Sequence, residues 1–119
     1  MRKAIICFLE KDEEILLLHT DYKSKLVWNG VSGYIDEGEN EKDAAVREIR
    51  EEIGVETKQE DLIRKGSHDI FTIFLLKKWS GIPESKETSI LELKWFKKDN
   101  LPYSQMHEGN KEWLPELLK

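Results

Sequence analysis

The chain has 119 residues, a mass of 14.0 kDa and a formal net charge of -5. This length suits one domain over residues 1–119, and the acidic balance excludes a coat for nucleic acid, which needs a basic surface. A single cysteine, Cys7, excludes an internal disulfide, and no apolar run approaches the roughly 18 residues of a membrane span. We therefore expect a cytoplasmic protein with no membrane partner and no stable nucleic-acid partner.

The first third of the chain favours strands. Residues 2–10 and 15–19 are apolar runs separated by a polar turn, which predicts a hairpin. A polar loop is expected at residues 21–25. Residues 28–33 contain two glycines and an Asn-Gly step, so the chain is expected to bend there.

A helix is predicted over residues 41–53. Its apolar positions recur at helical spacing and are Ala44, Ala45, Ile49 and Ile53. Asn40 is a suitable N-cap, and Gly54 stands where a helix commonly ends in a left-handed residue.

The second half returns to strands and closes on a helix. Strands are predicted over residues 69–79 and 91–97, and a short helix over residues 111–118 with Pro115 near its first turn. One helix between strands and a second at the C-terminal end predict an α/β fold with a mixed sheet.

The acidity is confined to one segment. Residues 36–61 carry eleven acidic and four basic side chains, a local charge of -7, while the remainder of the chain carries +2. On a helical wheel at 100° per residue, Glu48, Glu51 and Glu52 share an arc of about 100°. Such a face is either a solvated acidic surface or a site for a hard cation such as Mg²⁺ or Mn²⁺, which prefers carboxylate oxygens.

The surrounding residues favour the cation site. From the glycine loop to the end of the helix the chain reads Gly33, five residues, Glu39, seven residues, Arg47-Glu48-Ile49, one residue, Glu51-Glu52, one residue, Gly54-Val55. This pattern resembles the signature of the Nudix hydrolases at every specified position. The resemblance implies a Nudix-like α/β/α sandwich with a mixed sheet, in which residues 41–53 form the catalytic helix.

The resemblance also assigns roles. It implies that Glu48, Glu51, Glu52 and the backbone carbonyl of Ser32 bind Mg²⁺, or Mn²⁺, and that either Glu48 or Glu51 is the general base. Arg47 belongs to the same catalytic set, although its pairing with Glu39 is expected to be mainly structural. Gly33, Glu39 and Gly54 are expected to shape the motif. A further metal ligand outside it is expected, with Glu87 and Glu92 as the candidates.

Segments outside this motif resemble the MutT-type enzymes and the animal oxidised-purine nucleoside triphosphatases. They are Trp28-Asn29-Gly30, Trp95-Phe96, Leu101-Pro102-Tyr103, Met106 and Trp113-Leu114-Pro115. The resemblance implies that Asn29, Gly33, His107 and Asn110 contact the substrate, although Asn29-Gly30 is also a plausible plain turn. Where the animal enzymes have a tryptophan and two aspartates, this chain has His107, Gly109 and Asn110, so no carboxylate pair remains at those positions.

Three functions fit these observations. The first is a metal-dependent pyrophosphohydrolase of (d)NTPs such as 8-oxo-dGTP, releasing the monophosphate and pyrophosphate. The second acts on another nucleoside diphosphate derivative, such as an ADP-sugar, a dinucleoside polyphosphate or a capped RNA end. The third is a Nudix-like module that binds a nucleotide without cleaving it. A homodimer is possible in each case, as for many proteins of this family.

Overall fold

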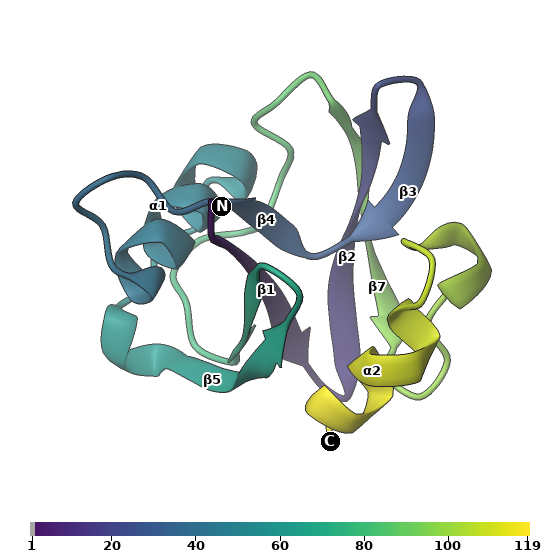
Figure 1. The fold of residues 1–119 in the computed structure, drawn as a ribbon. Helices are drawn as coiled ribbons and strands as arrows, with labels where there is room; N and C mark the ends of the chain where they lie inside the picture. Colours follow the sequence, from purple (N-terminus) through teal and green to yellow (C-terminus); the bar gives the residue numbers. More distant parts are fainter. Residues whose placement is uncertain (1) are drawn as a thin grey trace.

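The computed structural model describes residues 2–119 and has the order of elements shown in Figure 1. The strands are β1 (Ala4–Lys11), β2 (Glu14–Tyr22), β3 (Lys25–Asn29), β4 (Val31–Tyr34), β5 (Leu62–His68), β6 (Phe71–Leu76) and β7 (Ile90–Lys97). The helices are α1 (Glu41–Ile53) and α2 (Asn110–Leu117), with short 3₁₀ turns η1 (Gln59–Asp61) and η2 (Tyr103–Gln105).

The sheet is mixed. Its order is β3-β2-β1-β6-β5, with β4 paired to β1 and β7 paired to β2. Strand β1 runs parallel to β6 and antiparallel to β4 and β2. Strand β1 therefore joins the two halves of the sheet: most of its length pairs with β4 and β6, and its last residues pair with β2.

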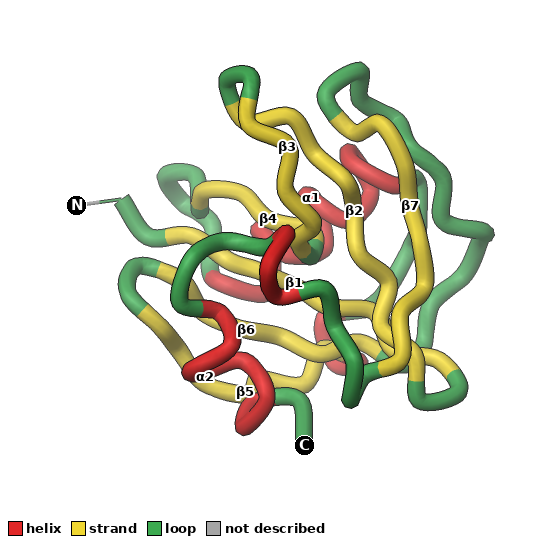
Figure 2. Tube along the Cα trace, turned by 90° about the vertical axis from the view of Figure 1, so that its right-hand side faces the viewer, coloured by secondary structure: helices red, strands yellow, loops and turns green. Residues whose placement is uncertain are grey.

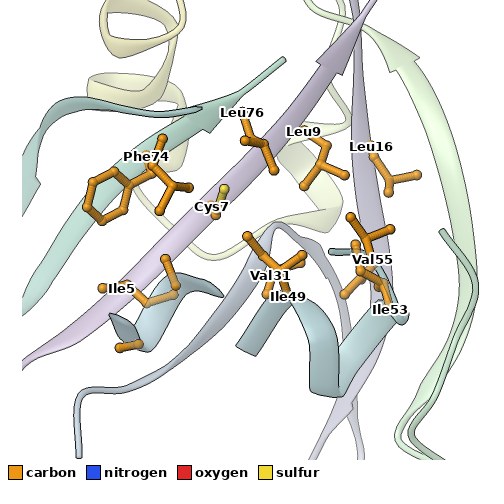
Figure 3. Packing of buried hydrophobic residues seen from close by; sticks show 14 of the residues in the cluster. Ile5, Cys7, Leu9, Leu16, Val31, Ile49, Ile53, Val55, Phe74 and Leu76 are labelled. Carbon is orange, nitrogen blue, oxygen red and sulfur yellow. The ribbon is translucent and has the colours of Figure 1, made fainter. Parts of the chain in front are cut away.

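The two helices cover opposite sides of these strands, with α2 nearer the viewer and α1 beyond the strands in Figure 2. Alternation along β1 explains this arrangement, because successive strand side chains point to opposite faces. Ile5, Cys7 and Leu9 pack in the cluster that contains the apolar face of α1, as Figure 3 shows. Ile6 and Phe8 pack in the second cluster, which contains Leu114 of α2. The α/β/α layering and the mixed sheet are confirmed.

Helix α1 has the predicted bounds and caps. The Asn40 side chain accepts a hydrogen bond from the Asp43 N–H at 2.8 Å, and the Asp43 carboxylate accepts one from the Asn40 N–H at 3.1 Å. This reciprocal pair satisfies two donors that a helix start leaves unpaired. Gly54 ends the helix in the left-handed conformation with φ 69°, and its N–H donates to the Arg50 carbonyl.

The expected loop at residues 21–25 is wrong. Strand β2 continues to Tyr22, β3 begins at Lys25, and the turn between them consists of Lys23 and Ser24, both with positive φ. Two such residues make the tight turn that matches strand twist, but glycine or asparagine usually marks it. The expected bend at residues 28–33 is narrower in the structure, where only Gly30 separates β3 from β4.

Three other elements differ from expectation. Strand β5 has no predicted counterpart. The long strand predicted over 69–79 corresponds to β6, which is shorter. Asp69, with φ 55°, lies in the turn between β5 and β6, so the strand starts later than predicted. The final helix begins at Asn110, which places Pro115 in its second turn rather than its first. Neither helix is long and apolar enough to cross a membrane within residues 2–119.

Candidate active site

The acidic face of α1 lies against β4. The Glu48 side chain is only 13% exposed, whereas that of Glu51 is 49% exposed. The Glu48 and Glu52 carboxyl groups are close enough to change one another's pKa, and the Ser32 backbone lies near enough to Glu52 to lower its pKa. The helix therefore presents a half-buried carboxyl pair beside the strand and a third carboxylate nearer to solvent.

Gly33 makes this close approach possible. A Cβ atom at this position would overlap the carboxyl group of Glu48. Gly33 lies in β4 opposite Ile5 of β1, so the strand itself is held in place by the ladder. The glycine is needed here because a side chain would displace the acid, as the motif predicted.

Arg47 of α1 binds the segment between β4 and α1. Its Nε and Nη2 atoms donate to the two oxygens of Glu39 at 2.7 and 3.0 Å, and Nη2 also donates to the Tyr34 carbonyl at 3.0 Å. A fork of this kind fixes orientation as well as distance. The pKa of Glu39 is held below its usual value by the Arg47 hydrogen bond first and by the Asp36 N–H second.

Arg47 also separates the acids on the helix. Its Nη1 atom contacts Glu48 and lies 3.4 Å from the Glu51 carboxylate. Within residues 2–119, no three acidic, histidine or cysteine side chains converge on one point where a metal ion would fit. Glu48 and Glu52 meet, but the guanidinium holds Glu51 to one side. The three-carboxylate metal set therefore remains a prediction.

Burial changes the proton affinity of the carboxyl pair. The pKa of Glu52 is raised to about 9, first by loss of solvent and then by the hydrogen bond and charge of Glu48 and the charge of Glu87. Burial also raises the pKa of Glu48, against the opposing influence of Glu52 and Arg47. Two carboxyl groups that lie close together cannot both carry a full negative charge at low cost, so they share a proton or bind a cation. Their oxygen chemistry suits Mg²⁺ or Mn²⁺, which bring the positive charge that the pair lacks.

A small pocket of about 140 Å³ adjoins this pair. Its lining residues are Thr20, Asp21, Tyr22, Ser32, Glu52, Glu87, Ser89 and Ile90. Glu87 thus reaches the site from the segment before β7, whereas Glu92, the other candidate outside the motif, is not part of this lining. Ser32, the predicted backbone ligand, lies in β4 and borders the same pocket as Glu52.

A second pocket, of about 360 Å³, brings the predicted substrate residues together. Asn29, His107 and Asn110 all line it, although Gly33 does not. Asn29 is 3% exposed, and its Oδ1 atom has no hydrogen-bond partner among the described residues. An unpaired buried acceptor costs about 1–3 kcal/mol, so a ligand that donates a hydrogen bond there would be stabilised.

Sequence reasoning missed several residues of this second pocket. Asp69 and Glu108 bring carboxylates to it from positions outside the compared motif, and His68 stacks on Trp113 at 4.6 Å along its wall. These residues come from the end of β5, the turn after it, the turn before α2 and α2 itself. Because β5 itself was not predicted, no local pattern indicated that these residues would meet.

His107 and Tyr22 close one side of the pocket, with ring centroids 5.2 Å apart. Burial, and then the nearby charge of Lys25, lower the pKa of His107, so the ring is neutral at neutral pH. Tyr22 and Ser32 line both pockets, and the Tyr22 hydroxyl lies 3.5 Å from the Ser32 hydroxyl. The pocket beside Glu52 and the pocket of about 360 Å³ therefore adjoin each other at Tyr22 and Ser32.

A family model described as the NUDIX domain matches residues 1–117. The chain belongs to this family. An oxidized purine nucleoside triphosphate hydrolase of Mus musculus is 30% identical over 103 residues, which cover 77% of this chain and 63% of that protein. The NAD-capped RNA hydrolase NudC of Stutzerimonas stutzeri is 27% identical over 120 residues, which cover 96% of this chain and 43% of that protein. The chain thus spans at most 63% of either relative.

Solved structures agree with the family. The MutT NUDIX hydrolase from Burkholderia pseudomallei superposes with a TM-score of 0.77 at 25% identity, over 89% of this chain and 90% of that one. A NUDIX hydrolase from Nitrosomonas europaea gives a TM-score of 0.81 at 20% identity, over 98% and 87% of the two chains, which supports the fold alone. The chain is a Nudix protein of the MutT type.

Proposed function

We propose that this Nudix protein is a metal-dependent nucleoside polyphosphate pyrophosphohydrolase. Its substrates would be (d)NTPs such as 8-oxo-dGTP, and its products the nucleoside monophosphate and pyrophosphate. One observation supports this most strongly: Glu52, half-buried beside Glu48, lines a small pocket that adjoins a second pocket of about 360 Å³ at Tyr22 and Ser32. A nucleotide has the matching layout, with phosphates at one end and a base at the other.

The acidic groups have separate tasks in this proposal. Glu48, Glu52, Glu51 and the Ser32 carbonyl would hold Mg²⁺ or Mn²⁺. A bound cation would neutralise phosphate oxygens and make water more acidic. The general base is Glu48, which Arg47 orients, or Glu51, which is half-exposed and open to a water proton.

The base end would be read by Asn29, His107 and Asn110. The buried Asn29 amide offers hydrogen bonds to a purine edge, and the neutral His107 ring offers a stacking face. Asp69 and Glu108 add hydrogen-bond acceptors that the resemblance to the oxidised-purine enzymes did not predict. These groups favour a base that donates hydrogen bonds, as guanine and 8-oxoguanine do.

A substrate panel with product identification tests the proposal. The wild-type protein with Mg²⁺ would be incubated with 8-oxo-dGTP, dGTP, dATP, an ADP-sugar, a dinucleoside polyphosphate and an NAD-capped RNA. We expect monophosphate and pyrophosphate from the guanine nucleotides at the highest rate. Faster cleavage of an ADP-sugar or a capped RNA would replace this substrate with the corresponding alternative. Binding without any phosphate release would favour the non-catalytic module.

The cellular setting stays a prediction. We expect the protein in the cytoplasm, with a small nucleotide as its partner rather than a nucleic acid, and a homodimer remains possible. Cell fractionation and light scattering of the purified protein are the direct checks.

A further inference from the structure

Two hydroxyl side chains stand where the two pockets of the site meet. Tyr22 is the last residue of β2 and Ser32 lies in β4. These two residues line both the pocket beside Glu52 and the pocket of about 360 Å³. A ligand that reaches from one pocket into the other therefore passes the Tyr22 and Ser32 side chains.

The larger pocket contains a group that calls for a ligand. Asn29 lines this pocket and is 3% exposed, and its Oδ1 atom has no hydrogen-bond partner among residues 2–119. A buried acceptor without a partner is rare in folded proteins. In the proposed function Asn29 faces the base, and the phosphates lie beside Glu52. The part of a nucleotide that joins these two ends is the sugar.

The two hydroxyls have hydrogen-bonding capacity to spare. The Tyr22 and Ser32 oxygens are 3.5 Å apart, which is longer than a normal O–H···O hydrogen bond of roughly 2.5–3.0 Å. Each hydroxyl can donate one hydrogen bond and accept two. A third hydroxyl placed between them can therefore accept from one and donate to the other at normal length.

The Tyr22 hydroxyl is held in position by its own surroundings. Tyr22 pairs with Lys25 at the end of the β2–β3 hairpin, next to the turn. Its ring lies against the His107 ring, with centroids 5.2 Å apart and planes tilted by 57°. Because His107 is the proposed stacking face for the base, Tyr22 stands beside the base on the side towards the pocket that Glu52 lines.

We propose that Tyr22 and Ser32 form a sugar subsite whose two hydroxyls bind the 3′-hydroxyl of the nucleotide. In a deoxyribonucleotide the 1′ carbon carries the base and the 5′ oxygen carries the phosphates, so the 3′-hydroxyl is the free hydroxyl of the sugar. This inference rests on the proposed function, which sets the base and the phosphates in the two pockets. It makes the protein selective for nucleotides with a free 3′-hydroxyl over 2′,3′-dideoxynucleotides.

The test combines removal of a hydroxyl from the protein with removal of the hydroxyl from the sugar. The variants are Tyr22→Phe, which keeps the ring against His107, and Ser32→Ala, which keeps the backbone carbonyl. The matched control is Tyr103→Phe, because Tyr103 lines neither of these two pockets. Each protein would be assayed for kcat/KM with Mg²⁺ and either dGTP or 2′,3′-dideoxyGTP, and titrated with dGMP and 2′,3′-dideoxyGMP. Urea unfolding reports whether each fold is retained.

We expect the wild-type protein to prefer dGTP over 2′,3′-dideoxyGTP about tenfold in kcat/KM, which corresponds to two hydrogen bonds of about threefold each. Tyr22→Phe and Ser32→Ala should each lose about threefold on dGTP and almost nothing on 2′,3′-dideoxyGTP, because the deleted partner is already absent. Tyr103→Phe should keep the full preference. The inference is overturned if the wild type has no such preference, or if Tyr22→Phe and Ser32→Ala lower both substrates equally.

The monophosphate titrations separate this inference from the proposed function, because they need no cleavage. If the wild type releases pyrophosphate but the variants leave its sugar preference unchanged, only the sugar subsite is wrong. If it binds dGMP more tightly than 2′,3′-dideoxyGMP, and Tyr22→Phe removes part of that difference, the subsite stands even when no nucleotide is cleaved. A wild-type protein that neither binds nor cleaves these nucleotides would refute both proposals.

Discussion

Substitution of Gly33 by alanine perturbs the site with little harm to the fold. The new Cβ atom would overlap the carboxyl group of Glu48, which is the flexible end of a side chain. The overlap is relieved when the Glu48 side chain rotates away, so the free energy of unfolding should fall by only about 1 kcal/mol, the low end for an added methyl group. The displaced carboxyl group leaves Glu52 and Arg47, and a shift of this kind is expected to lower kcat about 100-fold.

Gly30 provides the matched control. A Cβ atom there would lie 2.7 Å from the Cys7 carbonyl oxygen and 2.9 Å from the Phe8 ring, so the neighbours are backbone and a buried aromatic side chain. Neither can move easily, and Gly30→Ala should lower the free energy of unfolding by about 2–3 kcal/mol.

The two variants would be compared by urea unfolding and by initial rates of pyrophosphate release. We expect Gly33→Ala to lose mainly activity and Gly30→Ala to lose mainly stability. The reasoning is refuted if Gly33→Ala keeps near-wild-type kcat, because the close contact of this strand with Glu48 would then have no bearing on the chemistry.

Three other predictions concern Arg47, Glu52 and Asn29. Arg47→Lys loses the forked contact with Glu39, so urea unfolding should show a loss of about 1–2 kcal/mol, and an unchanged midpoint would contradict the structural role. The raised pKa of Glu52, about 9, means that it holds a proton at neutral pH and must release it to bind a cation. Mn²⁺ affinity should therefore rise about tenfold per pH unit from pH 7 towards 9, with proton release in calorimetry; a flat profile would count against it. Asn29→Ala should raise KM for the guanine nucleotide about tenfold with little change in unfolding, and an equal effect on dATP would argue against base reading.

Much of the fold was predictable because its signals are local. The bounds of α1 follow from the Asn40 cap, the apolar spacing and Gly54, which lie within one short segment. The hairpin of β2 and β3 was hidden because Lys23 and Ser24, not glycine, adopt the left-handed turn. Strand β5 was hidden because Ile63, Arg64 and Lys65 do not alternate apolar and polar residues, as a half-buried strand would.

The site was predictable in its acidic half and not in its base half. Glu48 and Glu52 meet because they are one helical turn apart, which spacing alone dictates. Asp69 and Glu108 reach the same pocket only because the turn after β5 lies near the turn that precedes α2. Likewise, nothing local distinguishes Glu87 from Glu92, and the difference comes from how the segment before β7 docks on α1.

The most direct measurement is the rate of pyrophosphate release by Glu52→Gln with Mg²⁺ and the preferred nucleotide. The exposed Glu60→Gln, outside both pockets, serves as the control. If α1 holds the catalytic cation, Glu52→Gln should lose activity by a factor of 10³ or more, on the order expected when metal-dependent charge stabilisation is removed, and should unfold cooperatively like the wild type. Near-full activity of Glu52→Gln would contradict the assignment of this helix as the metal-binding centre.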